Sequence, residues 1–255
     1  MAYWTGSSRP FDPFADHGIV VSGKGGSSRR LKVSAEPIEL ANVAGRTLFP
    51  SPIQGAWLPF ERFAESRSSE RNDSTLHSHS SQEVLTYVLD GTVDSEEEGG
   101  IHTTLPAGWV DVLLAQKERQ HELASADGAP ARWLSVVLRL PPRALGEEPF
   151  LHRPEACRSE SPAPGVSLTV VRSPGPQNPS GLELVDLRFG GIVSWERRIP
   201  AGHRGLAYVL DGDGAIDGDV VSAGVGILVE NVTQFTLRSS RGFRVVLASA
   251  PYASS

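Results

Sequence analysis

Short apolar runs separated by turn-forming residues dominate this chain. The run at residues 84–89 (Val-Leu-Thr-Tyr-Val-Leu) ends at an Asp-Gly pair, and the run at 206–210 ends in the same way. Runs of this length that are rich in β-branched and aromatic residues predict strands, and long stripes with helical spacing are scarce. The pattern therefore predicts an all-β fold.

An internal repeat accompanies this pattern. The pentapeptide Tyr-Val-Leu-Asp-Gly at 87–91 recurs letter for letter at 208–212. Pro-Ala-Gly at 106–108 corresponds to Ser-Ala-Gly at 222–224, and each introduces a further apolar run. Self-similarity of this kind is the signature of a duplicated structural unit, so we expect two tandem β-barrel domains.

Composition suggests where the domains begin and end. We expect an N-terminal arm at 1–30, a first barrel at 31–140 and a second barrel at 180–255. The segment 141–179 is crowded with proline, which cannot continue a helix or occupy a central strand. It predicts a linker with one short strand, Val166 to Val171.

Charge and cysteine content exclude several classes of protein. The 255 residues carry a net charge of −6 and form no long basic run, which argues against direct nucleic-acid binding. The N-terminal residues resemble neither a signal peptide nor a membrane span, and Cys157 has no second cysteine to pair with. We therefore expect a soluble cytoplasmic protein with no membrane contact.

Candidate chemistry lies just before the first pentapeptide. His77 and His79 are two residues apart, so a strand would place both imidazoles on one face. Glu83 follows at i+4 from His79 and stays on that face if the strand is regular. His121 lies on a later predicted strand that can return its side chain to the barrel interior. This set suits Fe(II) and can also hold Mn, Ni, Cu or Zn.

The second half of the repeat lacks these ligands. Aligning the pentapeptides places Arg198 and Pro200 at the positions of the first two histidines, and Arg204 at the position of the glutamate. Aligning Gly224 on Gly108 places Leu237 at the position of the third histidine. We therefore expect at most one metal site per chain, in the first barrel.

Together these motifs resemble the pirin branch of the cupin superfamily. The resemblance consists of His-x-His-x3-Glu running into Tyr-Val-Leu-Asp-Gly, then Gly-x5-Pro-x-Gly, then a histidine thirteen residues later. It covers about residues 30–250 and implies two tandem cupin barrels, of the double-stranded β-helix or jelly-roll type. Pirin-like proteins include flavonol-cleaving dioxygenases and iron-bearing transcriptional cofactors.

The fourth ligand departs from the pirin pattern. Pirins tend to carry a glutamate ligand two residues after the third histidine, and Leu123 occupies that position here. The alternatives are Glu83, then Glu122 if a bulge re-aims it, and then three histidines with water. Glu97 and its two glutamate neighbours, at 96–98, are expected to form a solvated hairpin tip.

The resemblance leaves two functions open. The first is a metal-dependent dioxygenase-like enzyme that acts on a small organic molecule, with Glu83 as a possible general base beside the ion. The second is a non-catalytic regulatory or binding protein of the pirin type, with a degenerate metal site.

Overall fold

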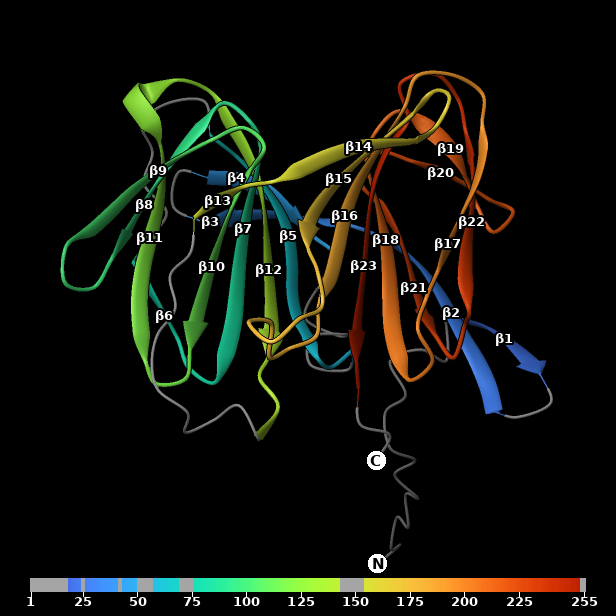
Figure 1. Ribbon diagram of the computed structural model, residues 1–255, viewed down its shortest axis with the longest axis horizontal. Helices are drawn as coiled ribbons and strands as arrows, with labels where there is room; N and C mark the ends of the chain where they lie inside the picture. Colours follow the sequence, from blue (N-terminus) through green and yellow to red (C-terminus); the bar gives the residue numbers. More distant parts are fainter. Residues whose placement is uncertain are drawn as a thin grey trace, which may run out of the picture.

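The computed structural model describes residues 18–23, 26–40, 43–49, 57–68, 76–142 and 154–252. In these ranges the chain is built from strands with one short 3-10 helix, η1 (Ala126–Gly128), and two β lobes lie side by side (Figure 1). The expected all-β class is confirmed. No helix in the described ranges is long and apolar enough to cross a membrane. Most of the expected N-terminal arm, residues 1–17, and residues 143–153 of the expected linker lie outside the described residues.

Two structural units follow one another, preceded by β1 (Gly18–Gly23). The first unit contains β2 (Gly26–Ser34), β3 (Glu36–Leu40), β4 (Val43–Thr47), β5 (Phe60–Ser68), β6 (His77–His79), β7 (Gln82–Asp90), β8 (Thr92–Glu97), β9 (Ile101–Pro106), β10 (Trp109–Ala115), β11 (Arg119–Ser125) and β12 (Ala131–Arg139). The second contains β13 (Glu155–Ala156), β14 (Arg158–Ala163), β15 (Val166–Arg172), β16 (Glu183–Phe189), β17 (Ser194–Arg198), β18 (His203–Asp211), β19 (Asp213–Ile216), β20 (Asp219–Ser222), β21 (Val225–Glu230), β22 (Gln234–Ser239) and β23 (Arg244–Pro251).

Strand pairing shows the duplication directly. The small sheet of the first unit has the order β6-β11-β8-β9, and that of the second has the order β17-β22-β19-β20. The large sheets share the orders β10-β7-β12-β5-β4-β3 and β21-β18-β23-β16-β15-β14. Each of these strands of the first unit therefore corresponds to the strand of the second unit whose number is higher by eleven, as β6 corresponds to β17.

The first strand of each unit pairs with the large sheet of the other unit. β2 pairs with β21 in the second large sheet, and β13 pairs with β10 in the first. Parts of the segments expected to be an arm and a linker thus supply edge strands to both sheets, and the short strand expected at 166–171 is present as β15. Proline is compatible with an edge strand, as Pro37 in β3 and Pro162 in β14 show.

The central strands of the two large sheets are buried on both faces. The largest apolar cluster draws residues from both units and includes Leu85 and Tyr87 on β7 together with Leu206 and Tyr208 on β18. Separate clusters fill the interiors of the two barrels. Burial on both faces explains why β7 reads as an almost continuous apolar run.

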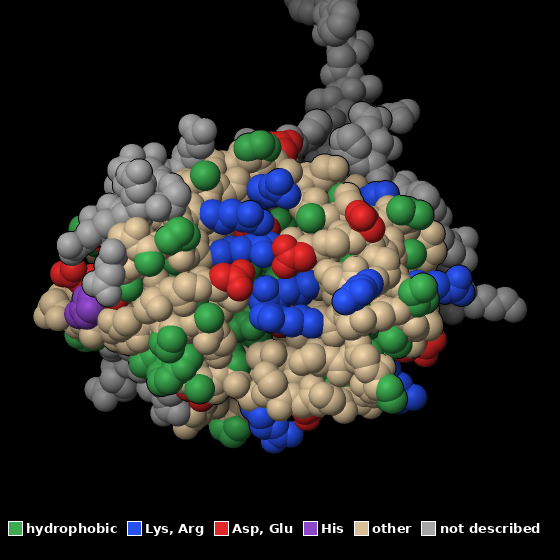
Figure 2. Space-filling model, turned by 90° about the horizontal axis from the view of Figure 1, so that it is seen from above, with side chains coloured by type: hydrophobic (Ala, Val, Ile, Leu, Met, Phe, Trp, Pro, Cys, Tyr) green, Lys and Arg blue, Asp and Glu red, His purple; other side chains and the backbone are tan. Residues whose placement is uncertain are grey.

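Charged side chains collect at the seam between the lobes. On the face shown in Figure 2, arginine and lysine side chains gather in the middle with acidic side chains among them. The ion pairs at this seam include Arg132 with Asp211 at 2.9 Å and Arg244 with Asp90 at 3.9 Å. The apolar interface between the lobes is therefore bordered by cross-domain ion pairs.

Candidate metal centre

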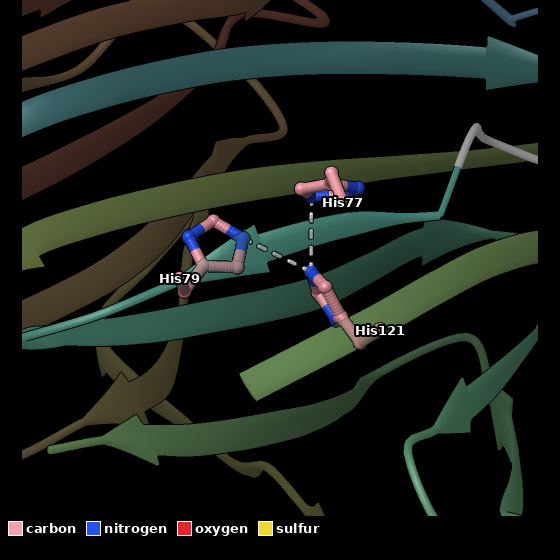
Figure 3. A group of neighbouring side chains, drawn as sticks. All are labelled: His77, His79 and His121. Atoms are coloured by element: carbon pink, nitrogen blue, oxygen red, sulfur yellow. Dashed lines mark hydrogen bonds between the residues drawn. The ribbon is translucent and has the colours of Figure 1, made fainter. Parts of the chain in front are cut away.

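Three histidine side chains meet inside the first barrel. His77 and His79 lie on β6, and His121 lies on β11 directly opposite His77 in the antiparallel register. Nε2 of His121 is 3.1 Å from Nε2 of His77 and 3.2 Å from Nε2 of His79 (Figure 3). Within the described ranges, these three residues are the one group of His, Cys, Asp or Glu whose donor atoms are close enough to share a metal ion.

The spacing of the three nitrogens suits a first-row ion. Nitrogens bound to one ion at about 2.1 Å lie roughly 3.0 Å apart at octahedral angles and about 3.4 Å apart at tetrahedral angles. Both measured separations fall in this range. A neutral imidazole nitrogen carries either a hydrogen or a lone pair, so three lone pairs directed at one point are satisfied together by one cation.

A chain of side chains behind His79 fixes its orientation. Nδ1 of His79 donates to Oε1 of Gln82 at 2.7 Å, and the Gln82 amide nitrogen in turn donates to Glu61. Arg139 donates to the other oxygen of Glu61 at 2.6 Å. Because Nδ1 carries the hydrogen, the lone pair of Nε2 faces the other two histidines. Burial lowers the pKa of His79, which keeps the ring neutral and able to bind a metal.

Glu83 does not join the histidines. It is fully buried on the opposite face of β7, where its carboxylate accepts from Arg172 at 3.0 Å in the interdomain interface. The i+4 spacing assumed one regular strand, but Ser81 has a φ of 58° between β6 and β7 and breaks the alternation. Val84 therefore takes the interior face that was expected for Glu83.

A different glutamate lies beside the triad. Glu97 is opposite His121 in the pairing of β11 with β8, so the two side chains share the interior face, and Glu97 is 6% exposed. Glu122 pairs with the exposed Glu96 on the outer face. The expectation that residues 96–98 form a solvated hairpin tip is therefore wrong for Glu97, which is buried. The alternation of residues 93–97 was the sequence signal for this inward position.

The histidines line a cavity of about 160 Å³. Leu123, at the position where pirins tend to carry a glutamate, contributes to the wall. Apolar groups form much of the remaining surface, and one arginine reaches it. The lining residues are Arg62, Ser66, His77, His79, Val84, His121, Leu123, Trp133, Ser135 and Val137.

The second barrel has no counterpart of this triad. The pairing of β22 with β19, compared with that of β11 with β8, places Phe235 and not Leu237 at the position of His121. The pairing of β17 with β22 then places Arg197 and Ile199 at the positions of His77 and His79. The ungapped sequence alignment had placed Arg198 and Pro200 there. The structure corrects it because the connection from β17 to β18 is longer than that from β6 to β7.

The space corresponding to the metal cavity is nearly closed in the second barrel. The cavity at this place has a volume of about 10 Å³. Phe235 and Leu247 contribute to its wall, and both belong to the apolar cluster that fills this barrel. The contrast with about 160 Å³ in the first barrel locates the candidate centre in the first unit alone.

Comparison with solved structures identifies the fold. No protein-family model matches the sequence, and no curated protein sequence does. GK1651 from Geobacillus kaustophilus is 18% identical, with a TM-score of 0.76 over 87% of this chain and 96% of its own. Quercetin 2,3-dioxygenase from Acinetobacter baumannii is 16% identical, with a TM-score of 0.77 over 92% and 87%. The bacterial pirin YhhW from Escherichia coli, in complex with nickel(II), is 16% identical, with a TM-score of 0.70 over 88% and 100%. The fold of this chain, with its two tandem barrels, is therefore similar to that of the pirin and the quercetin 2,3-dioxygenase structures.

Proposed function

We propose that this protein is a metal-dependent, pirin-like cupin that acts on a small organic molecule through oxygenase-type chemistry. The observation that carries the proposal is the convergence of three imidazole nitrogens at one point beside a cavity. Two proteins with this fold support it, one named a quercetin 2,3-dioxygenase and one solved with nickel(II).

Fe(II) is the proposed ion, with Mn, Ni, Cu or Zn as alternatives. His77, His79 and His121 would hold it, and Glu97, opposite His121 in the pairing of β11 with β8, is the proposed carboxylate partner. A bound Fe(II) ion with open positions supplies a route for electrons between a coordinated organic ligand and O₂.

The protein's own residues prepare the site for this chemistry. Gln82 holds the tautomer of His79, which directs its lone pair toward the ion site. Leu123, Val84 and Trp133 give the cavity an apolar wall that limits the access of water. We further propose a cytoplasmic protein with a small-molecule substrate as its partner. The net charge of −6 and the lack of a long basic run in the sequence support the proposal that it does not contact nucleic acid directly.

Metal analysis after anaerobic loading with Fe(II) tests the proposal. We expect about one equivalent of iron per chain in the wild type and strong loss in His79→Ala. His102→Ala is the matched control, because His102 is exposed on β9 and its ring faces Asp94 at 3.6 Å. Less than roughly a tenth of an equivalent in the wild type, with the fold intact, would favour the non-catalytic binding protein instead.

Oxygen consumption then tests the reaction class. The iron-loaded protein is expected to consume O₂ when an oxidisable substrate is added, and His79→Ala is expected not to. Turnover under strict anaerobiosis would point to metal-assisted isomerisation or hydrolysis and would contradict the oxygenase assignment.

A further inference from the structure

Arg62 reaches the cavity that holds the three histidines. It lies on β5 directly opposite Val137 of β12, and Val137 faces the barrel interior. Paired residues on neighbouring antiparallel strands share a face, so the Arg62 side chain also points inward. Both residues line the cavity together with His77 and His79.

The charge of Arg62 has no ion-pair partner among the residues that the structure describes. In the described part of the protein, no carboxylate forms an ion pair with it, and its neighbour Glu61 is engaged by Arg139 and Gln82. Burial lowers the pKa of Arg62, but a guanidinium group stays protonated in proteins.

A divalent ion on the histidines would add a second cationic centre to the same cavity. The three imidazoles are neutral ligands and offset none of this charge. Glu97 supplies one negative charge beside His121, and it does not line the cavity. Two cationic centres in a partly apolar space favour a ligand that brings its own negative charge.

The second barrel offers an internal comparison. Tyr87 pairs with Leu134 and Tyr208 pairs with Val246, which aligns the closing strands of the two units. With this alignment, the counterpart of Arg62 is Glu183, which faces Ser249 on β23.

In the second barrel the charge of Glu183 is paired within the barrel itself. Glu183 accepts from Arg197, the residue at the position of His77, and this ion pair lines the cavity of about 10 Å³. The second barrel therefore pairs its arginine with a carboxylate of its own. In the first barrel Arg62 instead lines a cavity of about 160 Å³.

We propose that the cavity of the first barrel binds a small organic anion whose carboxylate pairs with Arg62 while an adjacent oxygen faces the histidine triad. This inference rests on the proposed function and names its substrate class. The cavity is below the roughly 300 Å³ at which pockets for drug-sized ligands begin, so the anion is small. Val84, Leu123 and Trp133 would contact its apolar part.

Anaerobic calorimetric titration of the iron-loaded protein tests this assignment. The probes are 2-oxobutyrate and its neutral isostere 2-oxobutyramide, which keep the same oxo oxygen and differ in charge at the other end. We expect the wild type to bind the acid at least about tenfold more tightly than the amide, because charge-assisted hydrogen bonds are stronger than neutral ones.

Variants of Arg62 locate the source of the preference. Arg62→Gln is expected to weaken binding of the acid by about tenfold or more, to leave the amide within about twofold, and to keep the iron content. Arg62→Lys should retain part of the preference, since the charge remains without the planar fork. Arg158→Gln, at an exposed arginine on β14, should match the wild type.

The outcomes separate this inference from the proposed function. Equal affinity of the wild type for acid and amide, or a preference that survives in Arg62→Gln, would overturn the role of Arg62. If the wild type takes up no iron, the proposed function fails, and the same titration of the metal-free protein still tests Arg62. A preference for the acid that Arg62→Gln abolishes would then support anion binding alone.

Discussion

The hydroxyl of Tyr87 donates a 3.0 Å hydrogen bond across the domain boundary to Oδ2 of Asp186. The second unit makes the equivalent contact with the first: the hydroxyl of Tyr208 donates to Oε2 of Glu65 at 2.7 Å. Both tyrosines open the repeated pentapeptide, and both carboxylates lie on equivalent strands, β16 and β5. The two units are therefore joined by reciprocal contacts related by an approximate two-fold axis.

An arginine donates to each of the two carboxylates that accept from the tyrosines. Arg132 donates to Glu65 at 2.8 Å and also to Asp211, the acidic residue of the other unit's pentapeptide. Arg244 holds Asp186 at 2.8 Å, and its other nitrogen lies 3.9 Å from Asp90. The repeated Tyr and Asp thus serve domain pairing, which explains why the pentapeptide persists in a barrel without the histidine triad.

Tyr87→Phe should destabilise the fold through this interface. A buried hydrogen bond to a charged group contributes about 1.5–3 kcal/mol, so we expect a loss of about 2 kcal/mol in the free energy of unfolding. Urea unfolding monitored by tryptophan fluorescence measures it. Tyr252→Phe is the control, because its hydroxyl bonds Asn231 at an exposed position. Equal stability of the two variants would contradict the role assigned to Tyr87.

Gln82→Leu should weaken metal binding without removing a ligand. The substitution leaves Nδ1 of His79 without its acceptor, and loss of such an outer partner typically lowers metal affinity by about 10–100-fold. Competition with a chelator of known affinity measures the change. Gln120→Leu, at an exposed position of β11, should bind as the wild type does. An unchanged affinity in Gln82→Leu would show that the hydrogen bond does not orient the ring.

Glu97→Gln tests whether this carboxylate supports the ion. We expect lower affinity for Fe(II) because a negative charge beside His121 is removed. Glu96→Gln alters the exposed neighbour on the same strand and should have little effect. The comparison requires metal titrations of both variants, and equal affinities would exclude Glu97 from the centre.

Glu83→Gln should affect stability and leave the metal in place. Its carboxylate pairs with the half-buried Arg172 in the interdomain interface, away from the histidines. We expect a loss of about 2 kcal/mol in unfolding free energy and an unchanged iron content. Glu160→Gln, in an exposed pair with Arg158, should stay within about 0.5 kcal/mol of wild type. Loss of iron in Glu83→Gln would restore this residue as a ligand.

Cys157 should react slowly with alkylating reagents while the protein is folded. Burial, followed by the charge of Glu155, raises the pKa of its thiol to about 12. The thiolate is the reactive form and a free cysteine has a pKa of about 8.5, so at pH 8 the thiolate fraction of the folded protein is roughly 1,000-fold or more below that in urea. We therefore expect alkylation to be slower than in urea by at least about 100-fold. The folded-state rate should rise as the pH approaches 12. Iodoacetamide labelling followed by mass spectrometry measures both rates, and equal rates would contradict the burial.

The sequence by itself determined the fold class, the duplication and the three histidines. Strand periodicity and turn residues are local properties, so the pentapeptides and the His-x-His pair could be read without coordinates. The absence of histidines at the repeated positions already predicted one centre, although the ungapped alignment chose Arg198 instead of Arg197 for the position of His77.

Only the tertiary structure decided which other residues meet the histidines. One residue with positive φ, Ser81, turned Glu83 to the outer face, and strand register brought Glu97 and Arg62 to the inner one. The exchange of β2 and β13 between the sheets also lay beyond the local pattern. The physical reason is that the face of a strand changes with each residue, so a single irregular turn decides which distant side chains come together.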